Sequence, residues 1–301
     1  MIETYLSSMA FSGGHESHLD DTTDSSLTSH RDLLIDEGAS KFLVHEGSIA
    51  ELAADASSAS LRRWGGSVDA VIYASDPAST DDLMTFLSAM NLGTKNAAAV
   101  GGLGCGNLAV ALQVARGQIA MGASSVLVAT ADQADGPRLR ANGMTVLSDA
   151  AASMVVSSSP RADAFRICGI ATEIDPSVPY ISSAMARARA TMRTVKDASS
   201  RMPLLPPGAR FMTGNYGRSS LEFLTMAAGF DLDDLVGNAT ATIGHAFAAD
   251  IIYALMSSND TSAENSDYYR VLVTSSQSWS LIDLEACVNL SDNEADISRI
   301  E

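Results

Sequence analysis

The stretch that decides the fold is Gly101-Gly102-Leu103-Gly104-Cys105-Gly106-Asn107. An apolar helical pattern follows it from Leu108 to Met121, Gly122 ends that helix, and Ser125 to Ala131 is typical of a buried strand. Glycines allow a tight turn and the close approach of a ligand, and a helix N-terminus stabilises negative charge. This position favours the thiolate of Cys105, the form that attacks a thioester. The alternative is a small apolar residue packed in a glycine-rich turn.

A second stretch repeats this order of elements. Gly244-His245 precedes an apolar helical pattern from Ala246 to Met256, and a strand is expected from Arg270 to Ser275. A further strand from Leu281 to Leu290 ends this part, as a strand from Leu147 to Ser157 ends the first. The match is one of element order and not of residue identity.

The repeat predicts an α/β thiolase-like arrangement of two similar halves, residues 1–160 and 161–301, with layered helices and mostly parallel sheets. Helix starts that face each other across a pseudo-twofold axis would bring Cys105 and His245 together. Residues 12–41 are polar and are expected to form a loop. Further helices are expected over 48–64, 81–92, 180–200 and 218–228, and further strands over 68–74, 165–174 and 210–213.

Three side chains beside these elements could take part in chemistry with Cys105. Asp250 follows His245 by about one helical turn, so its carboxylate could fix the imidazole tautomer and stabilise the cation. The alternative is a histidine at a helix start beside an unrelated aspartate. Asn215, in the turn Gly214-Asn215-Tyr216-Gly217, could donate to a developing oxyanion or could cap the next helix.

Composition excludes several classes of protein. The chain has 301 residues, 46% of them hydrophobic, which is ample for a large core. A net charge of −17 disfavours nucleic acid as a partner. No apolar run is long enough for a membrane span and no signal peptide is evident, so we expect a cytoplasmic protein.

The cysteines and histidines outside these motifs are assigned packing or surface roles. Cys168 and Cys287 lie within apolar strand patterns, and the spacing of the three cysteines fits neither a disulfide set nor a metal site. Three histidines of the polar segment lie near acidic residues, but nothing fixes a metal-binding geometry there. They are His15, His18 and His30.

A basic cluster interrupts this acidic chain on one expected helix. Its members, all within fifteen residues, are Arg187, Arg189, Arg193, Lys196 and Arg201. Such a cluster could contact an acidic carrier protein, or it could simply face water.

Around Cys105, Asn215 and His245 the chain resembles the β-ketoacyl-ACP synthase III family of the thiolase superfamily. The resemblance is best over 81–157, continues over 211–255, and is poor in the first 40 residues. Cys105, Leu112 and Gly122 have the family's relative spacing. Two further segments carry the likeness, Leu92-Gly93-Thr94-Lys95-Asn96 and Ser148-Asp149-Ala150-Ala151-Ala152.

The resemblance implies roles for single residues. Cys105 matches the acyl-accepting cysteine, whose backbone N–H contributes to an oxyanion hole. Asn215 matches the Asn of the family's His-Gln-Ala-Asn motif, but the His of that motif falls on Met212. His245 falls where condensing enzymes carry the Asn of Gly-Asn-Thr. The last glycine-rich loop is changed to Ser275-Ser276-Gln277-Ser278-Trp279.

These departures break the His and Asn pair that stabilises an enolate during condensation. A Gly-His pair with Asp five residues after the His resembles the branch that transfers acyl groups to hydroxyls or amines. The resemblance therefore implies an acyltransferase with Cys105, His245, Asp250 and Asn215 in its site. Its acyl group would pass from an acyl-carrier-protein or CoA thioester to Cys105, and then to a small-molecule acceptor in natural-product biosynthesis.

The resemblance also implies a homodimer with no tightly bound cofactor and no metal. The phosphopantetheine thioester would be a co-substrate, and its expected contacts are Arg187, Arg189, Arg193 and Arg218. Two alternatives stay open. One is a condensing enzyme that forms a carbon–carbon bond, and the other is a non-catalytic homologue that binds carrier proteins.

Overall fold

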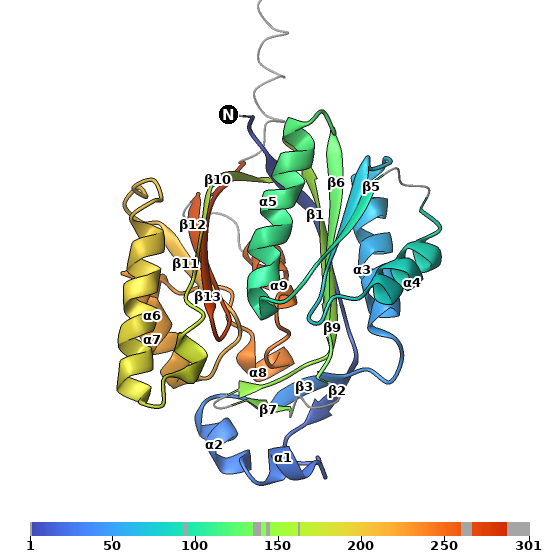
Figure 1. Ribbon diagram of the computed structural model, residues 1–301. Coiled ribbons are helices and arrows are strands. Elements are labelled where there is room, and N and C mark those ends of the chain that lie inside the picture. The colour runs from blue at the N-terminus through green and yellow to red at the C-terminus, as the bar shows by residue number, and fades with distance from the viewer. Residues whose placement is uncertain are drawn as a thin grey trace, which may run out of the picture.

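The computed structural model describes residues 2–92, 96–134, 140–142, 145–161, 163–259 and 267–287. Within them, one nine-stranded sheet forms the frame of the molecule (Figure 1). In spatial order its strands are β11 (Arg210–Thr213), β12 (Tyr268–Thr274), β13 (Ser278–Ala286), β10 (Phe165–Ile174), β1 (Tyr5–Gly13), β9 (Ala150–Ser157), β6 (Ser125–Asp132), β4 (Ala70–Ala74) and β5 (Asn96–Val100).

The strand order repeats on the two sides of the sheet centre. β1 and β10, the first strands of the two parts, lie side by side, and each is followed outward by the last strand of its own part, β9 or β13. β6 and β4 then lie outside β9, as β12 and β11 lie outside β13. At the edge formed by β11, the position that corresponds to β5 holds a single parallel bridge, between Phe211 and Leu235. The α/β fold of two similar halves is thereby confirmed.

The pairing direction changes across the sheet. Parallel pairing joins β4 to β5 and to β6 on one side, and β11 to β12 on the other. The inner pairs, from β6 through β9, β1, β10 and β13 to β12, are antiparallel. Helical crossovers connect the parallel strands, whereas only a three-residue turn connects β12 to β13 and can only reverse the chain. The sheet is therefore mixed where mostly parallel pairing was expected.

Helices cover the sheet in layers. α5 (Asn107–Ala120) and α9 (Ala249–Asn259) lie between the two sides of the sheet and contact strands of both (Figure 1). The outer layers are α3 (Ile49–Trp64) with α4 (Thr80–Met90), and α6 (Ala184–Ser199) with α7 (Arg218–Ala228). Because α5 and α9 share one apolar core, their N-terminal ends are fixed relative to each other.

Residues 12–41 are ordered, so the predicted loop is wrong. They contain β2 (His15–His18), α1 (Ser25–Thr28) and α2 (Arg31–Asp36), and β2 pairs with β3 (Lys41–Val44). The apolar side chains of this N-terminal lobe are sparse and show no period in the sequence. They nevertheless form a small core with Val146, a residue distant in the chain. That core contains Leu19, Leu27, Leu34, Ala39 and Phe42.

Parts of two predicted segments fall on residues that the structure does not describe. Gly93, Thr94 and Lys95 of the segment used for the resemblance, and 288–290 of the last expected strand, lie outside the described residues. The division into two domains at residue 160 stays a prediction, because the sheet is continuous from β1 to β10. In the described parts of the chain, no helix is both long and apolar enough to cross a bilayer.

The junction between the halves gives a stability prediction. Leu6 pairs with Phe165 on one side and Val156 on the other, and its side chain is buried. Leu6→Ala should lower the free energy of unfolding by about 2–5 kcal/mol, because it removes buried methyl groups and leaves a cavity. Ile2→Ala, at a half-exposed side chain, should change it by less than about 0.5 kcal/mol. Urea unfolding measures both, and equal effects would contradict this account of the junction.

Candidate active site

Cys105 lies in a tight helical turn directly before α5. The turn begins at Gly104, whose φ of 54° favours glycine. The turn between β12 and β13 packs against it, so that a Cβ at Gly106 would lie 2.5 Å from the Ser278 Oγ. A Cβ at Gly104 would lie 3.3 Å from the Cβ of Ser275. The glycines around Cys105 therefore make room for the second half of the chain.

His245 lies in an extended segment, which corrects the prediction of a helix from residue 246. α8 (Thr240–Ile243) ends before it and α9 begins at Ala249. Its N–H donates to the Val146 oxygen at 2.7 Å, and its carbonyl accepts from the Ser148 N–H at 2.9 Å. These bonds to the first half take the place of helical bonds and fix the position of the imidazole.

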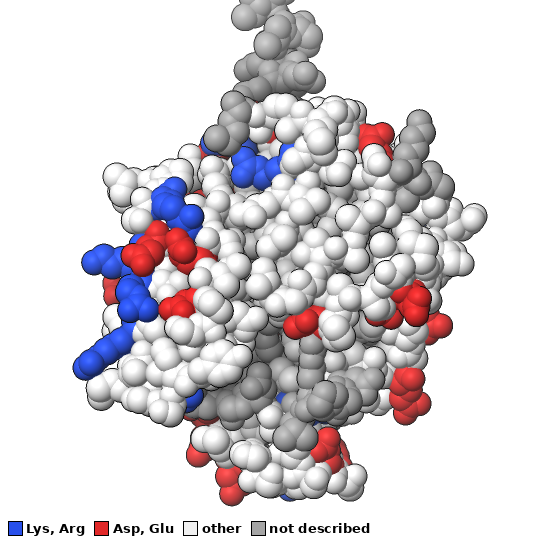
Figure 2. All heavy atoms as spheres, viewed as in Figure 1, with Lys and Arg blue, Asp and Glu red and all other residues white. Residues whose placement is uncertain are grey.

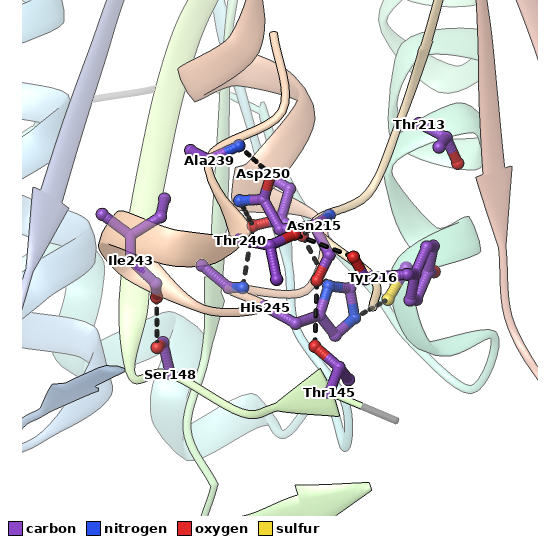
Figure 3. Close-up of polar contacts among 12 residues, drawn as sticks. Thr145, Ser148, Thr213, Asn215, Tyr216, Ala239, Thr240, Ile243, His245 and Asp250 are labelled. Atoms are coloured by element: carbon purple, nitrogen blue, oxygen red, sulfur yellow. Dashed lines mark hydrogen bonds and ion pairs between the residues drawn. The ribbon is translucent and has the colours of Figure 1, made fainter. Parts of the chain in front are cut away.

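The structure brings Cys105, His245 and Asp250 together in a line (Figure 3). The Cys105 Sγ lies 3.4 Å from the His245 Nε2. The His245 Nδ1 lies 2.5 Å from the Asp250 Oδ2. All three residues are buried. Because a carboxylate oxygen only accepts, Nδ1 carries the proton and Nε2 faces the sulfur.

Asp250 is held by a set of hydrogen bonds. Its carboxylate accepts from the Asn215 backbone N–H at 2.7 Å, the Asn215 Nδ2 at 2.8 Å and the Ala246 N–H at 2.8 Å. The Asn215 Oδ1 in turn accepts from the Ala239 N–H at 2.8 Å. Asn215 is thus engaged with the carboxylate, and its expected role as an oxyanion donor stays a prediction. Its side chain positions the residue that orients His245.

The charges of the site raise the pKa of His245. Burial alone would lower it, because an imidazolium is poorly solvated in the interior. The negative charges of Asp250 and Cys105, with their hydrogen bonds, outweigh burial and raise the pKa of His245 to about 10. These charges therefore favour the imidazolium form of His245.

Comparisons with solved structures match nearly the whole chain, although no protein-family model and no curated protein sequence matches it. ChlB3, described as an acyltransferase, has a TM-score of 0.79 at 14% identity, over 95% of this chain and 98% of that one. The 3-oxoacyl-[acyl-carrier-protein] synthase III of Aquifex aeolicus VF5 has a TM-score of 0.74 at 16% identity, over 94% of this chain and 99% of that one. Cerulenin-bound OleA of Xanthomonas campestris has a TM-score of 0.77 at 13% identity, over 94% of this chain and 96% of that one.

This chain has the ketosynthase III form of the thiolase fold. At such low identities the likeness establishes the fold, and the chemistry is argued from the site itself. The resemblance inferred from the sequence is confirmed at this level. Met212, which stands where the resemblance implies a condensing histidine, is a fully buried residue of β11 in the apolar core.

A cavity of about 560 Å³ opens near the triad of this ketosynthase III-like fold. It lies between α6, α7 and the turn after β12, and both Tyr216 and Thr274 line it. Tyr216 stacks on His245 with ring centroids 4.7 Å apart. Tyr216 was not predicted as a site residue, because one tyrosine in a turn carries no distinctive signal in the sequence. Among the described residues, no group of acidic, histidine or cysteine side chains is arranged to hold a metal.

The expected arginine contacts are divided between this cavity and the surface. Arg187 lines the cavity and donates to the Ile181 oxygen at 2.9 Å. Arg193 pairs with Asp175 at 3.3 Å, and Arg189 is exposed on α6. Arg218 is exposed at the start of α7. Figure 2 shows basic side chains gathered over α6 at the left edge of the molecule.

Asn215→Ala tests whether this residue positions Asp250. It removes the bond to the carboxylate and leaves the Ala239 N–H without its acceptor, so the free energy of unfolding should fall by about 1–3 kcal/mol. Alkylation of Cys105 by iodoacetamide should also slow, because His245 is less well held. Gln113→Ala, at an exposed amide side chain of α5, is the matched control. If stability and alkylation are unchanged in the Asn215→Ala variant while acyl transfer slows, the result would instead support Asn215 as an oxyanion donor.

Proposed function

We propose that this protein is an acyltransferase that moves an acyl group from a phosphopantetheine thioester, through Cys105, to a hydroxyl or amine. The observation that carries the proposal is the continuous line from the Cys105 sulfur through His245 to Asp250. A nucleophile, a base and a carboxylate that orients the base are the parts needed for two successive acyl transfers.

In the first transfer, the Cys105 thiolate attacks the carbonyl carbon of the donor thioester. The tetrahedral intermediate collapses, the bond to the donor sulfur breaks, and that sulfur takes the proton of the His245 imidazolium. The Cys105 N–H, at the start of a helical stretch, supports negative charge on the carbonyl oxygen. The products are acyl-Cys105, a free donor thiol and a neutral imidazole.

Acylation prepares His245 for the second transfer. The thiolate charge is one of the causes that raise the pKa of His245, and it disappears when Cys105 is acylated. The imidazole then takes the proton of the acceptor hydroxyl or amine as that group attacks the acyl carbon. When the Cys105 thiolate leaves, the thiolate–imidazolium pair is formed again, and protons balance over the cycle.

The position of Met212 favours transfer over condensation. Condensation requires an enolate equivalent to be stabilised, and buried Met212 offers no hydrogen-bond donor for that purpose. Among the described residues, His245 is the histidine that contacts Cys105, and its other nitrogen is engaged with Asp250. An imidazole oriented in this way is suited to removing a proton from an acceptor.

The cavity beside the triad supports an entry route for the donor. Arg187 lines the cavity, and the basic face of α6 lies next to it, so an acidic acyl carrier protein could dock while its phosphopantetheine arm enters. The edge of β5 away from β4 has no partner strand in the described part of the chain, and it suits pairing in a homodimer. We place the reaction in the cytoplasm and in natural-product biosynthesis as part of the same proposal.

His245→Ala separates the two transfers. Removing a general base typically costs about 10²–10⁴-fold in rate, so transfer to the acceptor should stall and acyl-Cys105 should accumulate. Asp250→Asn should slow transfer less. Intact mass and single-turnover transfer from pre-acylated enzyme measure both variants. Malonyl-thioester decarboxylation that depends on His245 would make the protein a condensing enzyme instead.

Cys105→Ala tests the nucleophile. It should abolish formation of the acyl-enzyme, because Cys105 is the thiol that contacts His245. Cys168→Ala and Cys287→Ala are matched controls and should acylate normally, since burial raises the pKa of both thiols. A stoichiometric acyl adduct on the Cys105→Ala protein would refute the assignment. No adduct on the wild type, with any of a panel of acyl thioesters, would support a non-catalytic protein.

Charge reversal on α6 tests the carrier protein. Replacing Arg187, Arg189 and Arg193 by glutamate should slow acylation by a carrier-protein thioester more than acylation by a pantetheine thioester. High salt should reduce this difference, because it screens the charges. Single Arg189→Glu is compared with Arg62→Glu, an exposed arginine on the opposite outer layer. Equal losses with both donors would contradict a docking role.

A further inference from the structure

Phe247 has an unusual backbone conformation beside the triad. Its φ of 54° lies in the left-handed region, which bulky side chains rarely adopt because the Cβ crowds the backbone. Among the non-glycine residues that the structure describes, only Ser8 and Asn91 share a positive φ. Glycine would adopt this conformation without strain. A strained phenylalanine at the active site therefore points to a role for its side chain.

The hydrogen bonds around Phe247 fix the place at which the chain turns. Before it, the Ala246 N–H donates to the Asp250 carboxylate at 2.8 Å, and after it α9 begins at Ala249. Two residues therefore connect the bonded segment to the helix. The Phe247 carbonyl accepts from the Asp250 N–H at 3.4 Å. With both ends fixed in this way, the turn falls on Phe247, and the backbone there determines where its ring lies.

The ring of Phe247 lies beside the imidazole of His245. Their centroids are 5.5 Å apart, at an interplanar angle of 37°. The ring of Tyr216 lies 4.7 Å from the same imidazole at 35° (Figure 3). Gly214 leaves room for this second contact, since a Cβ there would lie 3.0 Å from the tyrosine ring and 3.2 Å from the imidazole. Both aromatic rings are thus within the roughly 6 Å over which such a ring stabilises a cation.

We propose that Phe247 is a positioning residue for His245, and that its strained backbone serves to place a second aromatic ring against the imidazole. The inference rests on the proposed function. The two rings limit rotation of the imidazole, so that Nε2 stays toward Cys105 while Nδ1 stays on Asp250. Their π electrons also stabilise the imidazolium that forms when His245 takes the proton of the acceptor. Phe247 itself exchanges no proton and forms no bond.

The charged groups around the imidazole set how large this effect can be. Burial opposes a charge on the imidazole, whereas Asp250 and then Cys105 favour it and raise its pKa. The phenol of Tyr216 stays neutral, because burial above all raises its pKa well above the usual value. On the segment that bonds to the histidine backbone, Asp149 is paired with Arg140. Loss of one ring should therefore lower the pKa of the imidazole without abolishing its cation.

Phe247→Leu tests the ring, because leucine stays apolar but has no π electrons. The His245 pKa is measured by NMR from the pH dependence of its Hε1 signal, which is assigned by its absence in His245→Ala. It should fall by about half a unit to one unit. Single-turnover acyl transfer should slow about three- to tenfold, since the base is weaker and less well held. Phe165→Leu, which changes a ring packed on Tyr269 elsewhere in the same core, should leave the His245 pKa unchanged.

Phe247→Gly and Phe247→Ala test the strain, because both remove the ring and differ in their tolerance of a positive φ. The glycine variant should be the more stable one in urea, with an unfolding equilibrium constant roughly fivefold smaller. In a helix the order is reversed, so Ala254→Gly in α9 should destabilise the protein.

Two results would overturn the proposal. One is a His245 pKa that is unchanged in Phe247→Leu and in Phe247→Gly, which also lacks the ring. The other is an alanine variant at least as stable as the glycine variant, which would show that the backbone at this position is not strained. Neither measurement requires an acyl thioester, so both stand even if the proposed acyl transfer fails.

Discussion

The buried carboxylate of Asp250 is the constraint on which the rest of the site depends. An unpaired charge in this interior would be costly, so its four donors must all be in place: two from Asn215, one from Ala246 and one from His245. These donors come from the turn after β11 and from the segment before α9. One carboxylate therefore joins separate parts of the second half and sets the direction in which the imidazole faces.

The sequence predicted the frame of the fold and the meeting of its reactive residues. The bounds of β10, β11 and α7 agree with the expected ranges. A segment rich in apolar residues marks β10, prolines and Gly208 break the chain just before β11, and a helical period marks α7. The repeated element order placed Cys105 opposite His245, and the structure has the two side chains in contact. This prediction succeeded because it rested on topology, which a repeat encodes.

Local patterns could not show features that depend on distant partners. β1 was not predicted, because Ser7 and Ser8 interrupt its apolar residues, although neighbours on both sides bury its first six residues. The N-terminal lobe and the extended segment at His245 likewise depend on residues around Val146. The role of Asn215 follows from a hydrogen bond across 35 residues, which no local spacing reveals.

Cys105 and His245 are in contact although they are 140 residues apart in the chain, and each belongs to a different half. During synthesis on a ribosome, Cys105 can fold into its glycine turn long before His245 exists. The thiol then has no imidazole beside it. On the proposed function, an unfinished chain would thus be unable to capture acyl groups, and acyl transfer would begin only with the completed molecule. The order of the chain itself keeps Cys105 without its histidine partner until the second half has been made.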